Sequence, residues 1–399
     1  MMYKAYKYRL YPNKSQEELI LKHIGCCRYI YNYGLEKKIK VYQESKQGLS
    51  RFEIQSDLVF LKKQDETSWL KEVNSLSLQA SLANLDMAFT RFFKEKKGFP
   101  KFKSKKVGNQ SFQVIQNTKV DFDNNKVFLP KFKSGIKCKF HRTFEGKIKT
   151  STISKAPTGK YFISILVKVN EDLPKKKPID EKQAVGIDLG IKTFATLSDG
   201  IEIENPKHLR KSMKKLKRFQ RSLSRKQKES NNRKKSVKML AIQYEKVTNR
   251  RNDFLNKTSK FLIDNYNTIC LETLSSKKMM QTHKLAQALS DIAIGRFNEM
   301  IDYKAEWYGK NIIRIGRFEP SSKMCECGNI YRDLKLSDRV WKCPECGRIN
   351  QRDLLAANNI KKFAFCKNNT VGTTEINACG NMNCISDSAQ EAHKSLVCG

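Results

Sequence analysis

Three acidic residues combine a side-chain type and a position that point to metal chemistry. Asp188 closes the apolar run in GIDLG, Glu272 closes the one in ICLETL, and Asp353 opens the helical pattern of QRDLLAANNI. A carboxylate at the end of a buried strand is costly unless a cation accompanies it. We expect these three side chains to hold two Mg²⁺ ions, because oxygen ligands suit Mg²⁺ and a metal pair activates water against a phosphodiester.

Each acid taken singly has a simpler interpretation. An Asp or Glu that follows a strand is often a cap or turn residue. In this basic chain, an Asp ends one strand, a Glu ends another and an Asp begins a helix. This order favours one metal site over three unrelated caps. A degenerate site that keeps the acids but does not cleave remains the alternative.

Four cysteines form a second candidate metal site. Cys325 and Cys327 make a C-x-C pair, Cys343 and Cys346 make a C-x-x-C pair, and a glycine follows each pair. Four thiolates at this spacing are typical of one structural Zn²⁺, with scattered core cysteines as the alternative. The first pair is one residue shorter than the usual knuckle.

The charge of the chain points to a polyanionic partner. Lys and Arg number 78 against 40 Asp and Glu, which gives a net charge of +38. Phosphate contacts release counterions, so nucleic acid is the leading partner and a merely solvated surface the alternative. Basic density over 207–257 favours a phosphate-lined channel, and KKGFPKFKSKK (96–106) mixes cations with aromatics.

A membrane partner is not expected. The best apolar run, YFISILVKV, is too short to span a bilayer, and no lipidation signal is present. The first residues carry charge throughout and lack the apolar core of a secretory signal. We therefore expect a cytoplasmic protein.

Hydrophobic periodicity outlines the elements that must position these residues. We expect strands at 3–10, 184–197 (as a hairpin), 267–274 and 311–318, with several short strands between 108 and 172. Helices are expected from Lys14 to about residue 97, as an antiparallel pair within 207–257, at 286–307 and from Arg352 onward. The clearest helical stripe consists of Leu78, Leu82, Leu85, Phe89 and Phe92.

Taken together, the motifs resemble those of the TnpB family, insertion-sequence proteins related to the type V CRISPR effector nucleases. The resemblance runs through YRLYPNKSQ, GCCRYIYN, GFPKFKSK, GIDLGIKTFATLSDG, LSRKQK, ICLETL, EPSSKMC, CPECG and RDLLAANNI. It implies a guide RNA supplied by the transposon end and cleavage of double-stranded target DNA beside a short motif. Asp188, Glu272 and Asp353 match the family's three RuvC metal ligands, and Gln79 and Asn117 fall where the family reads DNA.

The resemblance also implies a mixed α/β, multidomain architecture. A helical recognition domain (13–97) is inserted in a β-barrel wedge domain (1–12 and 98–178), and a RuvC domain of RNase H fold follows (182–318 and 351–365). A zinc ribbon (319–350) interrupts the RuvC domain, and a disordered tail (366–399) resembles family endings that overlap the guide RNA gene. No protein oligomer is expected.

Two departures from the family pattern affect the last acidic motif. The family reads DRDxNAA there, whereas this chain has Gln351 for the first Asp and Leu355 for the Asn. Two other functions remain open: an RNA-guided DNA-binding regulator that does not cut, and a transposase that joins DNA ends. The intact acids favour a nuclease over the first. The guide-binding resemblance and the basic helices favour it over the second.

Overall fold

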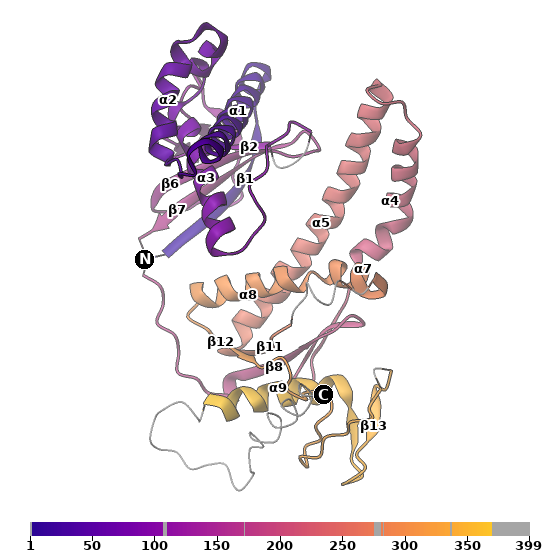
Figure 1. Ribbon diagram of the computed structural model, residues 1–399. Helices are drawn as coiled ribbons and strands as arrows, with labels where there is room; N and C mark the ends of the chain where they lie inside the picture. Colours follow the sequence, from indigo (N-terminus) through magenta and orange to yellow (C-terminus); the bar gives the residue numbers. More distant parts are fainter. Residues whose placement is uncertain are drawn as a thin grey trace. The chain divides into compact units, whose positions relative to one another are not determined.

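The computed structural model describes residues 2–106, 110–170, 172–274, 281, 283–335 and 337–368 (Figure 1). Contacts between residues divide the chain into two units. Unit 1 comprises Met1–Pro178, Pro206–Asn265 and Ser276–Asn311, and unit 2 comprises Ile179–Asn205, Tyr266–Ser275 and Ile312–Gly399. Each unit is built from segments that are distant in sequence.

Unit 1 contains a seven-stranded sheet in the order β2-β6-β7-β1-β5-β4-β3. Its two long central strands, β1 (Met2–Tyr11) and β7 (Tyr161–Val169), pair antiparallel over nine residue pairs, from Met2↔Val169 to Leu10↔Tyr161. Among the described strands β2 and β3 form the two edges, so the short strands, expected to form a small β-barrel or sandwich, build an open half-barrel. The remaining strands are β2 (Gln110–Val114), β3 (Lys119–Asp121), β4 (Lys126–Phe128), β5 (Ile136–Lys139) and β6 (Lys147–Lys155).

The first helices of unit 1 follow the predicted pattern. They are α1 (Lys14–Ser45), α2 (Arg51–Lys63), the 3₁₀ helix η1 (Asp65–Glu72) and α3 (Ser75–Lys94). Asn13 and Gln16 form a reciprocal capping box that starts α1. The stripe of α3 is confirmed at Leu78, Leu82 and Leu85, which are all buried.

The basic region of unit 1 is a helical hairpin of α4 (His208–Ser224) and α5 (Asn231–Asn265), as predicted (Figure 1). The Asp291 carboxylate accepts hydrogen bonds from the backbone N–H of Leu209 at 2.9 Å and of Arg210 at 3.3 Å, which caps α4. The single helix predicted over 286–307 is wrong. Two helices, α7 (His283–Ile292) and α8 (Ile294–Trp307), meet at Ala293, whose φ of 53° breaks the helical path.

Unit 2 is organised around a five-stranded sheet in the order β10-β9-β8-β11-β12. Its strands are β8 (Ala184–Leu189), β9 (Thr193–Leu197), β10 (Glu202–Glu204), β11 (Thr268–Glu272) and β12 (Asn311–Ile315). The helix α9 (Arg352–Asn368) packs on β8 (Figure 1), and the small hairpin of β13 (Val340–Lys342) and β14 (Ile349–Gln351) leads directly into it.

Two predicted boundaries of unit 2 shift. Strand β12 ends at Ile315 instead of 318, and α9 continues to Asn368 instead of ending at 365. The tail predicted to be disordered lies, from 369 onward, outside the described residues. None of the described helices is both long enough and apolar enough to cross a membrane.

Candidate functional site

The register of two parallel strands places the first two predicted acids side by side. Leu271 of β11 pairs with Ile187 of β8, so the next residue on each strand is Glu272 and Asp188. Residues at the same level of neighbouring parallel strands point to the same face of the sheet. The four residues before each acid are buried, so each carboxylate emerges where its strand leaves the core.

Because Gly186 of β8 has no side chain, the helix α9, which carries the third acid, can pack close to this strand. A Cβ on Gly186 would lie 2.0 Å from the backbone oxygen of Ala357 and 2.8 Å from the backbone nitrogen of Lys361, both in α9. Asp353 stands one helical turn before Ala357 on α9, and Asp188 stands two residues after Gly186 on β8. The close contact therefore turns Asp353 toward the edge of the sheet that carries Asp188.

We expect Gly186→Ala to destabilise unit 2 and to displace Asp353 from the edge of the sheet that carries Asp188. The added methyl group meets backbone atoms of α9, which cannot rotate away, and overpacking of this kind costs about 1–3 kcal/mol. Thermal unfolding compared with Gly48→Ala, whose Cβ would meet no atom within 4 Å, provides the measurement. Equal melting temperatures for the two variants would contradict the tight packing of α9 on β8.

The surroundings of Asp188 disfavour the charged form of its carboxyl. Burial raises the pKa of the Asp188 carboxyl from 3.8 to about 7, and the negative charges of Glu272 and Asp353 add to the rise. Arg352 and Arg339 oppose it without cancelling it. A divalent ion would favour the charged form, so this donor set suits a hard cation.

The other two acids have partners within the protein. The hydroxyl of Ser321 donates a hydrogen bond to Glu272 Oε1. Both oxygens of Asp353 accept from Arg339 Nη1, at 2.8 and 3.1 Å. Among the described residues, the three acids do not form a compact group of possible metal ligands as the four cysteines do. The structure thus gathers the acids at one edge of the sheet but leaves Asp353 paired with Arg339, and their role as metal ligands stays a prediction.

A pH dependence follows for the metal-free protein. Because the folded chain holds the Asp188 proton more tightly than the unfolded chain, the free energy of unfolding falls as pH rises from about 4 to about 7. Asp188→Asn, which mimics the protonated acid, should raise the melting temperature at pH 8 in EDTA and raise it clearly less at pH 5. Scanning calorimetry at both pH values measures this. A wild-type protein that equals the variant at pH 8 would show that Asp188 carries no such penalty.

The four predicted cysteines do form a compact group. Their Sγ atoms all lie within 4.8 Å of one another. Two Sγ–Sγ distances, Cys325 to Cys346 and Cys327 to Cys343, are 3.7 Å. A tetrahedron of thiolates around Zn²⁺ at about 2.3 Å has edges of about 3.8 Å, and these two distances match that edge length.

Backbone turns and amides complete the cysteine site. Gly328 (φ 94°) and Gly347 (φ 72°) adopt left-handed conformations that favour glycine, as expected for the turn after each pair. The Gly347 N–H donates to the Cys343 carbonyl at 3.0 Å. The backbone N–H of Cys346 lowers the pKa of the Cys343 thiol to about 6, which favours the thiolate that a metal needs.

Leu355, which stands where the family has Asn, packs against the cysteine-containing ribbon. It is buried in a small cluster with the ribbon residues Cys325, Leu334, Trp341 and Cys343. The substitution therefore adds an apolar contact between α9 and the ribbon, whereas Gln351 is exposed at the end of β14. Neither change removes a predicted ligand.

The predicted DNA-reading residues lie in unit 1. Gln79 is half-buried on α3, and Asn117 is exposed between β2 and β3 with a φ of 63°, a conformation that asparagine tolerates. No hydrogen bond joins the two in the described structure. Several residues were missed by the sequence analysis: Gly186, Ser321, Arg339 and Asn359, whose amide donates to the carbonyls of Ser321 and Met324. Only Gly186, in GIDLG, carried a signal in the sequence.

A basic groove runs along α4 in unit 1. Its volume is about 980 Å³, and its lining consists of eight cations and one serine: Lys211, Lys214, Lys215, Lys217, Arg218, Arg221, Ser222, Arg225 and Lys226. Leu216 and Val247 are buried where α4 and α5 pack, so the cations remain on the outer face. A groove with one sign of charge is suited to a phosphate backbone.

Three known family models match parts of the chain. Residues 1–47 match a helix-turn-helix domain model, residues 164–283 a probable transposase model of the insertion sequence IS605 OrfB type, and residues 295–360 a Cas12f1-like TNB domain model. The last match contains the four cysteines and Asp353.

Relatives that match about nine tenths of the chain have names that refer to RNA-guided DNA cleavage. A protein of Streptomyces pristinaespiralis named "Putative RNA-guided DNA endonuclease" is 36% identical over 360 residues, covering 90% of this chain and 88% of its own. InsQ of Escherichia coli K12, named likewise, is 30% identical over 89% of this chain and 91% of its own. The chain belongs to the TnpB family of transposon-encoded proteins.

A solved structure shows the same fold. The Cas12f1–sgRNA–target DNA complex contains a chain that aligns with 90% of this protein and 98% of its own length, with a TM-score of 0.55 and 14% identity. At this identity the likeness defines the mixed α/β fold alone.

Proposed function

We propose that this protein is an RNA-guided endonuclease of an insertion sequence that cleaves double-stranded DNA next to a short adjacent motif. The observation that carries the proposal is the pairing register that sets Asp188 beside Glu272, with Asp353 turned to the same edge by the contact at Gly186. The names of the relatives supply the guide RNA and the DNA substrate as the partners to test.

In the proposed reaction the three acids have separate tasks. Two Mg²⁺ ions would supply an activated water and charge stabilisation at the phosphodiester. Asp188 would hold a metal ion in its deprotonated form. Glu272 is held in orientation by the Ser321 hydroxyl. Asp353 would hold a metal ion in place of its ion pair with Arg339.

The nucleic acids would be held mainly by unit 1. The eight cations of the α4 groove are suited to the backbone of the guide RNA or of its duplex with DNA, and they contribute part of the net charge of +38. Gln79 and Asn117 are proposed to contact the adjacent motif. The four cysteines would hold one structural Zn²⁺.

A regulator that binds DNA without cutting uses the same surfaces but has no need of the acids. Such a protein would be free to lose Asp188, Glu272 or Asp353, and all three are present. Their retention favours the nuclease.

Reconstitution from the native locus tests the proposal. The protein is expressed together with its flanking DNA, the copurifying RNA is sequenced, and the complex is given a supercoiled plasmid that carries the matching target beside randomised flanks. We expect one RNA species from the element's end and linear plasmid only with Mg²⁺, guide and target together. Tight, guide-dependent binding without any cleavage would establish the regulator instead.

A further inference from the structure

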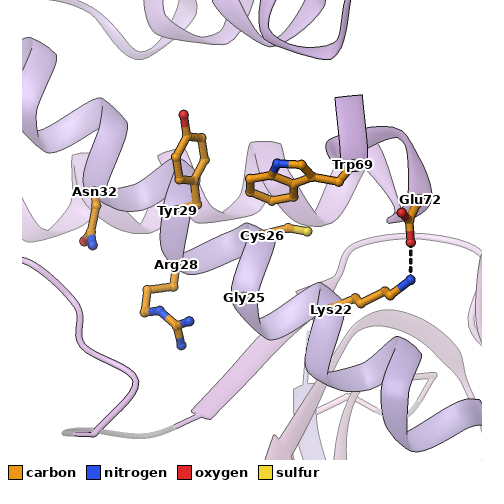
Figure 2. A pocket seen from close by; sticks show the side chains of 8 residues that line it. All are labelled: Lys22, Gly25, Cys26, Arg28, Tyr29, Asn32, Trp69 and Glu72. Carbon is orange, nitrogen blue, oxygen red and sulfur yellow. Dashed lines mark hydrogen bonds and ion pairs between the residues drawn. The ribbon is translucent and has the colours of Figure 1, made fainter. Parts of the chain in front are cut away.

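A pocket on the outer face of α1 has no role in the function proposed above (Figure 2). It lies between α1 and η1 in unit 1, and its volume of about 450 Å³ falls within the range of small-molecule sites, roughly 300–1,000 Å³. Its lining consists of Lys22, Gly25, Cys26, Arg28, Tyr29, Asn32, Trp69 and Glu72. The α1 residues recur every three or four positions, so they share one helix face.

Gly25, in this pocket, is a glycine that packing does not explain. A Cβ built there meets no other atom within 4 Å, although glycine inside a helix costs roughly 1 kcal/mol relative to alanine. The second glycine of α1 is different, because a Cβ on Gly34 would lie 2.9 Å from Leu82 Cδ2 of α3. Gly25 therefore keeps a space open that the protein itself does not fill.

Two aromatic rings wall this space. The rings of Tyr29 and Trp69 lie 5.1 Å apart at an angle of 71°, and Trp69 remains 37% exposed. The indole N–H of Trp69 donates to the Glu66 carbonyl at 2.9 Å, which fixes the ring. An immobile, partly exposed indole is a ready stacking surface for a flat ring.

The charged groups around the pocket favour an anionic ligand. Lys22 and Glu72 neutralise each other in an ion pair (Figure 2). Arg28 has no acidic partner among the described residues, so its guanidinium is available for a phosphate.

The amide of Asn32 holds a basic segment of the chain beside this face of α1. The Asn32 side chain accepts from the backbone N–H of Lys103 at 2.7 Å and donates to its carbonyl at 3.0 Å. These two bonds hold the basic segment 101–106 beside α1. Asn32 is thereby largely committed to the protein, and Arg28 is the residue best placed to meet a ligand.

We propose that this pocket binds one unstacked nucleotide of a bound nucleic acid, with its base against Trp69 over Gly25 and its phosphate on Arg28. The proposal rests on the nucleic-acid-binding function above and adds to it a site outside the acidic edge and the α4 groove. Guide RNA and a DNA strand offer the same base and phosphate, so the experiment must separate these two sources.

A reactive-cysteine site is a poorer account of the same pocket. Burial raises the pKa of the Cys26 thiol to about 11, so the thiol stays protonated at neutral pH. No group of three or more metal-ligating side chains forms here among the described residues. The pocket offers stacking and a single cation instead.

The test compares full-length variants in binding to single-stranded RNA and DNA of about 12 nucleotides, measured by anisotropy at several salt concentrations. Trp69→Leu removes the stacking surface, and Gly25→Leu fills the pocket without a clash at Cβ. We expect each to weaken binding by about 5- to 100-fold with an unchanged salt slope. Arg28→Gln should also reduce the slope by about one phosphate contact.

The matched control is Tyr42→Leu. Tyr42 is an exposed aromatic of the same helix with a lysine, Lys46, over its ring at 5.7 Å, but it does not line this pocket. Its affinity should stay within about twofold of wild type. Gly25→Leu should melt no lower than wild type, so a binding loss there cannot be assigned to unfolding.

Photocrosslinking locates the nucleotide directly. Iodouracil placed only in the guide RNA, or only in the DNA, should give an adduct on the peptide of Trp69 or Tyr29, and the arm that crosslinks identifies the strand. Wild-type affinity in both pocket variants, together with adducts only elsewhere, overturns the pocket assignment. A wild-type chain that binds neither nucleic acid refutes the proposed function itself, which is a distinguishable result.

Discussion

Asp188→Ala is expected to abolish Mg²⁺-dependent cleavage while leaving guide and target binding intact. Loss of a ligand unseats the ion that activates water, and several kcal/mol of lost stabilisation corresponds to a rate decrease of about a thousandfold or more. Binding should survive because the cations proposed to contact phosphate belong to other elements, chiefly the α4 groove. The effect is therefore on the rate constant for cleavage and not on affinity.

Cleavage and gel-shift assays on the same preparation separate these two quantities. The matched control is Glu202→Ala, which removes an exposed acid from β10 of the same sheet. It should cut like wild type. An Asp188→Ala protein that still cuts would remove Asp188 from the proposed ligands, and one that neither binds nor cuts would indicate misfolding.

The acids were predictable from the sequence because each stands at the end of a short apolar run. The sequence could not predict their register. A parallel strand shifted by one residue would send Glu272 to the opposite face from Asp188, and only the observed pairing of Leu271 with Ile187 excludes that. The ion pair between Asp353 and Arg339 could not be predicted either, because it depends on how the β13–β14 hairpin packs beside α9.

The failures of prediction have local physical causes. Periodicity runs unbroken through 286–307, so nothing in it reveals that Ala293 adopts a left-handed conformation that divides the helix. Alternation predicts that the strands of unit 1 are half-buried, but it does not predict whether the outer strands close a barrel. The cysteines were easier because ligand spacing is a local property, and the glycine turns that follow them were predictable for the same reason.

Cys343→Ser is expected to cost the protein its zinc and much of the stability of the ribbon. The ribbon's own core is small, consisting of Cys325, Leu334, Trp341 and Cys343 with Leu355 from α9. A core of this size stabilises little without a metal. The serine hydroxyl is a poor replacement for a thiolate whose pKa is already lowered to about 6. We expect one Zn²⁺ per wild-type chain and substantially less than one in the variant.

Loss of the zinc should also disturb the edge of the sheet that carries the three acids, because α9 connects the ribbon to that edge. Strand β14 ends at Gln351 and α9 begins at Arg352, so a loosened hairpin frees the first turn that carries Asp353. Cleavage should therefore fall along with the melting temperature, while the dependence on Mg²⁺ is unchanged. Metal analysis, calorimetry and cleavage assays measure the three effects, with Cys366→Ser of α9 as the control that keeps its zinc. A folded, active wild-type preparation without zinc would show that the four cysteines serve only as core residues.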